Sequence, residues 1–204
     1  MHDRAFEPSL AALKDWRDEV ATALTGLRRW ALVHHLTEEH TASRLAHLER
    51  RLANDRLSIA FVAEVSRGKS ELINALFFAD IGTRLLPAGV GHATLCPTEI
   101  LHDPSRPPSI RLLPIETRET PRALREFIAE ADEWKSIALD PARPESLADA
   151  FDVLSETQTV SAAHAHNLGL SGEPGARVEI PRWRYAIVNF PHPLLAMGLT
   201  ILDT

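Results

Sequence analysis

The sequence is poor in cysteine and lacks a long apolar run, and each absence narrows the class of protein. Its 204 residues contain a single cysteine, Cys96, so no disulfide can form within the chain, which favours a reducing cytoplasm. The N-terminus has no basic start followed by an apolar core, and we expect no signal peptide. No run reaches the roughly 18 apolar residues that a membrane-spanning helix needs. We therefore expect any membrane contact of this chain to be peripheral.

A surplus of basic charge is also missing. The net charge is -6, and residues 1–56 hold nine basic and nine acidic side chains. Residues 57–204, with 13 basic and 19 acidic side chains, therefore carry the whole deficit. A general nucleic-acid binder normally presents a basic face. The charge pattern predicts no nucleic-acid partner.

Two amphipathic helices are expected before the first strand. Apolar residues recur at steps of three and four over residues 9–34, with Ser9 as the N-cap, and a second helix is expected over 38–54. Each helix has to bury its apolar stripe against another element. The sequence thus predicts an α-helical hairpin or bundle segment over residues 1–56.

The remainder, residues 57–204, predicts an α/β domain. The run "LSIAFVA" at 57–63 is typical of a strand buried on both faces of a parallel sheet, and a helix is expected in "SELINALFF" directly after it. Later elements are expected as a strand pair at 98–102 and 109–115, helices near 121–135 and 144–166, a connection at 167–182, and strands at 184–190 and 198–204.

Between the first strand and its helix, Ala63-x-x-x-x-Gly68-Lys69-Ser70 has the spacing of a phosphate-binding loop. Backbone N–H groups at a helix N-terminus favour an anion, and Gly68 lets the backbone approach it closely. Lys69 would supply charge near the β and γ phosphates, and the Ser70 hydroxyl would ligate Mg²⁺. Ala63 replaces the expected first Gly with the smallest side chain. The alternative, a solvated helix start, is disfavoured by the strand before the loop and the helix after it.

Two later stretches fit the same site. The hydrophobic run that closes on Asp203-Thr204 is typical of the strand whose Asp holds a water on Mg²⁺. Between the two motifs lies a loop rich in Gly and Pro, in which a Thr can complete the metal shell when the γ-phosphate is bound. Thr94 is the candidate and Thr98 the second choice. An ordinary surface loop is the alternative interpretation.

The stretch "FVAEVSRGKSELINALFFADIGTRLLPAGVGHATLCPTEI" resembles the N-terminal GTPase region of bacterial dynamin-like proteins. That family shows a Gly-Glu-Phe-Ser-x-Gly-Lys-Ser loop, a "LINAL" helix, a "LLP-G" turn and a Thr shortly before a Pro. The matching positions are Glu64, Ser66, Gly68, Lys69, Ser70, 72–76, Leu86, Pro87, Gly89, Thr94 and Pro97. The closing "PHPLLAMGLTILDT" resembles the segment that ends in the family's Asp-Thr-Pro-Gly motif, and inserts of large dynamin-type domains would account for the distance from Thr94 to Asp203.

The resemblance implies a P-loop NTPase fold, an incomplete GTPase domain over 57–204, and GTP hydrolysis with Mg²⁺ coupled to membrane remodelling. The implied nucleotide-binding residues are Glu64, Ser66, Arg67, Gly68, Lys69, Ser70 and Glu71. The implied metal ligands are Ser70, Thr94 and Asp203, and the implied catalytic residues are Lys69 and Thr94. The resemblance also implies a homodimer through GTPase domains and a cytoplasmic location, with contact to the inner face of the cell membrane through regions outside this chain.

Three departures from the family pattern limit these expectations. Ala63 replaces Gly, and Val65 stands where eukaryotic dynamins carry a Gln that orients the attacking water, which an apolar side chain cannot do. The chain also ends at Thr204, before the Pro-Gly, the guanine-reading Asn/Thr-Lys-x-Asp motif and the membrane-binding stalk. We therefore expect these 204 residues alone to be inactive, and strand 57–63 to keep an unpaired edge that lowers solubility.

Two alternatives stay open at this point. One is an ATP-binding P-loop enzyme, because no motif in the chain reads the base. The other is a non-enzymatic fragment that acts as a helical interaction module. Other residues able to carry chemistry are expected to be structural: the histidines lack metal-ligand spacing, Cys96 is expected to be semi-buried, and Trp16, Trp30, Trp134 and Trp183 are expected to pack.

Overall fold

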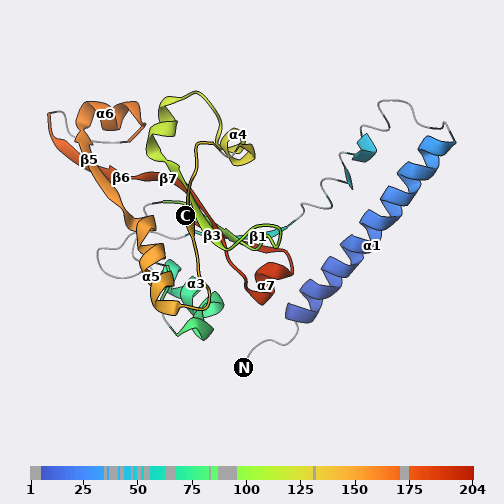
Figure 1. The fold of residues 1–204 in the computed structure, drawn as a ribbon. Helices are drawn as coiled ribbons and strands as arrows, with labels where there is room; N and C mark the ends of the chain where they lie inside the picture. The colour runs from blue at the N-terminus through green and yellow to red at the C-terminus, as the bar shows by residue number, and fades with distance from the viewer. Residues whose placement is uncertain are drawn as a thin grey trace. The chain divides into compact units, whose positions relative to one another are not determined.

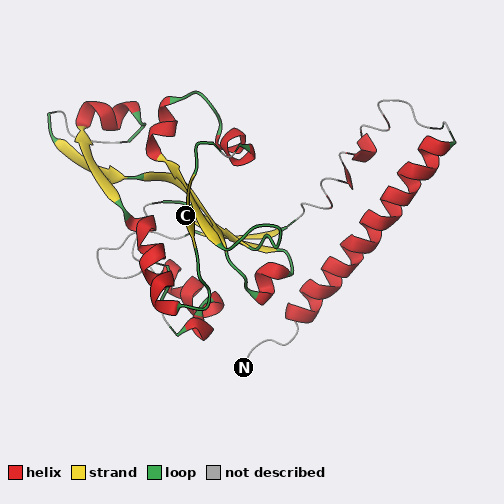
Figure 2. Cartoon of the chain, viewed as in Figure 1, coloured by secondary structure: helices red, strands yellow, loops and turns green. Residues whose placement is uncertain are grey.

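A mixed six-stranded sheet forms the centre of the α/β part of the computed structural model (Figure 2). The structure describes residues 6–34, 36, 41, 44–46, 48, 49, 52, 56–62, 68–82, 84–86, 96–130, 132–170 and 175–204. The strand order is β1-β8-β2-β7-β3-β4, and β5 and β6 form a separate two-stranded sheet. The protein is thus of the mixed α/β class that its sequence predicts.

The helices are α1 (Phe6–Val33), α3 (Lys69–Phe77), α4 (Leu124–Ala129), α5 (Pro144–Asp152), α6 (Ala162–Asn167) and α7 (Pro193–Ala196), with 3₁₀ turns at Ala79–Ile81, Ile115–Glu119 and Val153–Ser155. The strands are β1 (Leu57–Phe61), β2 (Thr98–Leu101), β3 (Ser109–Pro114), β4 (Lys135–Ala138), β5 (Thr157–Ser161), β6 (Arg177–Pro181), β7 (Trp183–Asn189) and β8 (Leu199–Asp203).

Strand β1 is at the edge of this sheet, beside β8. The Leu57 N–H donates to the Gly198 carbonyl at 3.0 Å, and the Thr204 hydroxyl donates to the Phe61 carbonyl at 3.1 Å. Because the two strands meet start to start and end to end, they run in the same direction. Strand β1 therefore pairs in parallel with the strand that ends at Asp203. Burial on both faces is not observed, because three of the five β1 residues are exposed and none is fully buried. Among the described strands, β1 has β8 as its neighbour and the other edge of β1 is unpaired, as expected.

The remaining pairings make the sheet mixed rather than parallel. β2 runs parallel to β7 and antiparallel to β8, and β3 is antiparallel to both β7 and β4. The expected pair of strands at 98–102 and 109–115 is wrong, because β7 lies between β2 and β3. These two sequence neighbours are separated in the sheet by a strand that begins only at Trp183.

Two apolar clusters cover the sheet. Leu113 and Ile187 on one face pack with Phe127 of α4 and with Trp134. Phe78, directly after α3, meets Phe151 of α5 and Phe190 edge to face. Figure 1 shows α3 and α5 on the side of the sheet opposite to α4. Helix α3 is thereby held against the core at its C-terminal end.

Strands β5 and β6 form an antiparallel ribbon with α6 beside it (Figure 1). Ile180 of β6, Ala165 of α6, Leu168 and Ile115 make a small core of their own. The continuous helix expected over 144–166 is therefore interrupted by β5 and resumes as α6, and the connection expected over 167–182 contains a strand. The first part of that expectation is met by α5, and the expected helix near 121–135 shortens to α4.

The chain divides into two compact units, Met1–Leu57 with Met197–Leu199, and Ser58–Ala196 with Thr200–Thr204. In the first unit, α1 begins three residues before Ser9, so Ser9 lies inside the helix and is not its N-cap. The expected second helix is described only at 41, 44–46, 48, 49 and 52, all helical, and Arg28 of α1 forms an ion pair with Glu49 at 2.9 Å.

The tryptophans divide between the interior and the surface. Trp134 and Trp183 are buried, as expected. Trp16 and Trp30, on α1, are 57% and 54% exposed, so neither lies in a core of the described residues, and the Trp30 ring contacts that of His34 on the same helix.

Candidate functional site

The candidate site begins at Gly68, the residue that precedes α3. Gly68 is the N-cap of that helix and has φ 81° and ψ 15°, in the left-handed region that favours glycine. The Leu72 N–H donates to the Gly68 carbonyl at 2.9 Å, which closes the first helical turn. Lys69 and Ser70 are therefore the first two residues of a helix whose N-terminal N–H groups favour an anion.

Asp203, the last residue of β8, meets these two residues. The Lys69 ammonium group donates to Asp203 Oδ1, and Ser70 Oγ donates to Asp203 Oδ2 at 3.3 Å. The Lys69 and Asp203 side chains are only 9% and 1% exposed. A buried carboxylate is unfavourable unless a cation and hydrogen-bond donors compensate it, and here both do. The structure thus brings together Lys69, Ser70 and Asp203, which the sequence assigns to one site from opposite ends of the domain.

The three side chains fit the chemistry of a magnesium–phosphate site. A hydroxyl and a carboxylate are the hard oxygen donors that Mg²⁺ prefers, and nucleotide phosphates and waters usually supply its other ligands. In the described part of the chain, no group of three or more His, Cys, Asp or Glu side chains is arranged to hold a metal ion. The Ser70 hydroxyl and the Asp203 carboxylate would fit a Mg²⁺ whose remaining ligands are phosphate oxygens and waters.

The ion pair between Lys69 and Asp203 affects how a metal could bind at this site. The Lys69 ammonium group and Mg²⁺ would compete for the same Asp203 carboxylate, since both are cations that bind its oxygens. Phosphate oxygens at the N-terminus of α3 would offer Lys69 a second anionic partner. The arrangement can therefore exchange a lysine–aspartate pair for lysine–phosphate and metal–aspartate pairs.

Thr98, the second choice for the switch threonine, is beside Asp203 in the ladder between β2 and β8. It is 1% exposed, and its hydroxyl donates to the Cys96 carbonyl at 2.9 Å. That bond holds the turn that enters β2, which points to a structural role. Cys96 is fully buried rather than semi-buried, and burial raises the pKa of its thiol from 9.0 to about 12. A thiol in that state is not a nucleophile at neutral pH.

Glu71, one of the expected nucleotide-binding residues, pairs with an arginine of the protein. Its carboxylate forms an ion pair with Arg84 at 3.1 Å, and both side chains are substantially exposed. The expected residues Glu64, Ser66, Arg67 and Thr94 lie outside the described residues, as do Ala63 and Val65. Their assignments stay predictions.

One residue of the site region was missed by sequence reasoning. Asn74, in the middle of α3, is 5% exposed and makes three hydrogen bonds to the backbone of Leu85 and Leu86. The signal was a polar side chain inside the apolar run "LINAL". Leu72 and Leu76 in the same run are exposed, and the buried stripe of α3 is Ser70, Ile73, Asn74 and Phe77.

Comparisons with known proteins find a likeness in structure only. No protein-family model matches the chain, and no curated protein matches it by sequence. The chain is similar to one in a solved structure of an oligomerised bacterial dynamin pair, described as a mechanism for long-range sensing and tethering of membranes. The two chains are 14% identical with a TM-score of 0.42, and the match covers 95% of this chain.

The chain spans 29% of the length of that bacterial dynamin chain. Within the described residues, no helix combines the length and the apolar character needed to cross a membrane.

Proposed function

We propose that this chain binds GTP with Mg²⁺ at the site formed by Lys69, Ser70 and Asp203, as the nucleotide-binding part of a dynamin-like large GTPase. The observation that carries the proposal is the convergence of these side chains. Ser70 and Asp203 are 133 positions apart, yet their side chains share a hydrogen bond at the N-terminus of α3. A helix start of Gly-Lys-Ser facing a strand-end aspartate is the arrangement used by phosphate-binding loops with Mg²⁺.

In the proposed complex the phosphates sit at the N-terminus of α3. Lys69 would exchange Asp203 for the β and γ phosphates, and Ser70 and Asp203 would be the residues that hold Mg²⁺. Glu64, Ser66, Arg67 and Gly68 would surround the phosphates, and Thr94 would sense the γ-phosphate. Bound Mg²⁺ would neutralise the charge that develops on the phosphate oxygens.

The proposal also includes GTP hydrolysis, dimerisation through GTPase domains and membrane remodelling. These three functions rest on the sequence resemblance. Val65 cannot itself orient the attacking water, because its side chain is apolar, as is the Phe of the family's loop. We propose that these 204 residues bind nucleotide and turn it over little or not at all.

Competition between nucleotides tests the choice of base. Fluorescent GTP bound to the intact protein is titrated with unlabelled GTP, ATP or GDP in the presence of Mg²⁺. Displacement by GTP and GDP but not by ATP at equal concentration supports the proposal. Equal displacement by ATP would indicate a P-loop protein that reads phosphates alone. If no nucleotide binds and Lys69→Ala changes nothing, the chain is a non-enzymatic module.

A further inference from the structure

Helix α1 carries a second apolar stripe beside the one that it buries. Its covered side includes Leu10 and Ala31, which are 4% and 8% exposed, and Arg28, which pairs with Glu49. Six further residues of α1 are all apolar and follow one another at alternating steps of three and four positions, which is the heptad pattern of a coiled coil. These six residues, called the seam below, are Leu13, Trp16, Val20, Ala23, Leu27 and Trp30.

The seam is largely open to water. Leu13 and Leu27 are 39% and 52% exposed, and Trp16 and Trp30 are 57% and 54% exposed. Helix α1 is one uninterrupted helix of 28 residues (Figure 1), so the seam forms a continuous line along it. A heptad stripe of large apolar side chains is typical of a helix that pairs with another helix. No described residue buries the four largest side chains of the seam, so its partner helix has to come from elsewhere.

We propose that the seam pairs with the seam of a second copy of this chain, and that the two α1 helices run antiparallel. If the pair is centred between Val20 and Ala23, each Trp of the seam faces a Leu of the second copy, and Val20 faces Ala23. A parallel pair would instead set Trp16 against Trp16, Trp30 against Trp30 and Ala23 against Ala23. That arrangement crowds the contact at two levels and leaves a gap at a third, which close packing disfavours.

The charges of α1 favour the same direction. Residues 6–20 contain four acidic and two basic side chains, whereas residues 21–33 contain Arg28 and Arg29 and no acidic side chain. An antiparallel pair places the acidic half of one helix beside the basic half of the other, and a parallel pair would place like beside like. Antiparallel helix dipoles also attract each other. An anionic lipid surface is a poorer partner, because helices that lie on membranes are rich in Lys and Arg.

Sedimentation of the intact protein over a range of concentrations measures the dissociation constant of this dimer. Nucleotide is left out, so that the dimerisation through GTPase domains in the proposed function is not measured. Leu27→Glu is compared with Leu32→Glu, since Leu32 is 48% exposed on the same helix but lies outside the seam. Leu27→Glu would bury two carboxylates in each dimer and is expected to raise the dissociation constant at least about 100-fold. Leu32→Glu is expected to leave it unchanged.

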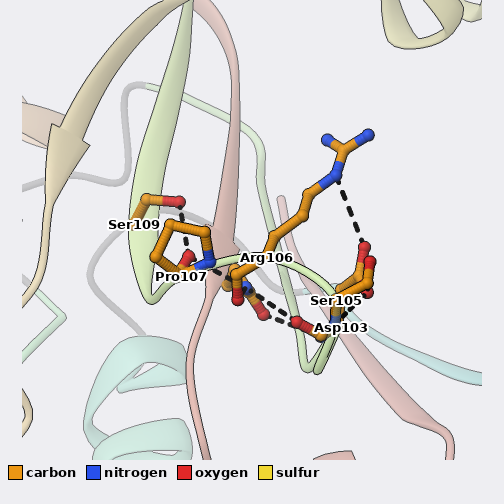
Figure 3. Close-up of polar contacts among 6 residues, drawn as sticks. Asp103, Ser105, Arg106, Pro107 and Ser109 are labelled. Atoms are coloured by element: carbon orange, nitrogen blue, oxygen red, sulfur yellow. Dashed lines mark hydrogen bonds and ion pairs between the residues drawn. The ribbon is translucent and has the colours of Figure 1, made fainter.

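Asn189→Ala controls for a general loss of stability. Asn189, at the end of β7, is 6% exposed, and its Nδ2 donates to the carbonyls of Asp103, Arg106 and Pro107 at 3.0–3.1 Å. Its Oδ1 accepts the Asp103 N–H at 2.7 Å, and Figure 3 shows the polar contacts of this loop. Asn189→Ala is expected to lower the midpoint of urea unfolding without changing the dissociation constant of the dimer.

Cross-linking tests the direction of the pair and leaves the seam unaltered. Ala12 and Val33 are exposed and flank the two ends of the seam. In an antiparallel pair, residue 12 lies beside residue 33 of the second copy, while the two copies of residue 12 are about 31 Å apart along the axis. The double variant Ala12→Cys with Val33→Cys should therefore give a linked dimer with a short thiol cross-linker. Each single variant should not.

Other outcomes overturn the proposal. A protein that is monomeric at every concentration has no such dimer, and equal weakening by Leu27→Glu and Leu32→Glu, or by Asn189→Ala, would mean that the seam is not the contact. Cross-linking of the single variants would show that the pair is not antiparallel. If the protein is monomeric and binds vesicles that contain phosphatidylserine, and Leu27→Glu abolishes this binding, the partner of the seam is a lipid surface.

Discussion

The Lys69 ammonium group and the Asp203 carboxylate form a buried ion pair across 134 positions of the chain. Lys69 starts α3 and Asp203 ends β8, so the pair links the helix at the candidate phosphate site to the second strand of the sheet. A buried charge that loses its partner is strongly unfavourable. The pair is therefore expected to stabilise this fold when no nucleotide is bound and to be exchanged when one is.

Removing Lys69 alone should be more harmful than removing the pair. Lys69→Met leaves the Asp203 carboxylate buried without its cation, and we expect a loss of about 3 kcal/mol in the free energy of unfolding. The double variant Lys69→Met with Asp203→Asn has no uncompensated charge and should recover most of that loss. Urea unfolding of the two variants and the unaltered chain measures the difference. Equal losses in the single and double variants would contradict the buried ion pair.

Gly68 is predicted to be required for its backbone conformation. Its φ of 81° is one that a side chain disfavours, while a Cβ built there meets no atom within 4 Å. Gly68→Ala should therefore lower the free energy of unfolding by about 1–2 kcal/mol through backbone strain alone. Gly26 of α1, which is exposed and also has open surroundings, is the control.

Gly26→Ala should raise the free energy of unfolding by about 0.5–1 kcal/mol, because Ala favours a helix interior. Opposite signs for the two Gly-to-Ala variants in thermal unfolding are the expected result. Two changes of the same sign would mean that Gly68 does not hold its left-handed conformation.

The buried thiol of Cys96 is expected to lower the free energy of unfolding at alkaline pH. Burial raises the pKa of its thiol from 9.0 to about 12, so in the folded chain the thiol stays neutral at pH values where the unfolded chain has ionised. The free energy of unfolding that depends on the neutral buried thiol is fully present below about pH 9. It is lost as the pH rises toward 12, by about 1 kcal/mol at pH 10.

Urea unfolding at pH 8 and pH 10, with Cys96→Ala as the control, measures this loss of stability. The alanine variant should lose less stability between the two pH values than the unaltered chain. Rapid alkylation of Cys96 in the native chain at neutral pH would show that the thiol is not buried.

The sequence predicts the phosphate-loop elements because their signals are local. An apolar run, Gly-Lys-Ser and an amphipathic run follow one another, and β1 and α3 form where these patterns place them. Asp203 was predicted at a strand end because its hydrophobic run is continuous. The meeting of its side chain with Lys69 depends on β1 and β8 being neighbours, which the strand order shows.

The errors arise where pairing partners are distant in the sequence. Thr157–Ser161 lies in the stretch whose pattern predicts a helix. It forms a strand because it pairs with Arg177–Pro181, which follows only after α6. Likewise β7, which begins only at Trp183, enters the sheet between β2 and β3. Asn74 was missed for a related reason, since its partners at Leu85 and Leu86 are set by the fold and not by spacing along α3.

Equilibrium binding of fluorescent GTP, measured with Mg²⁺ and with a chelator, tests the central claim most directly. The unaltered chain should bind at least about tenfold more tightly with Mg²⁺, and Lys69→Met should weaken binding by about 10- to 100-fold in both conditions. Asp203→Asn, which frees Lys69 and removes a metal ligand, should keep binding with the chelator present and lose most of the gain from Mg²⁺. GTP binding that is unchanged by Mg²⁺ and by both substitutions would contradict the account.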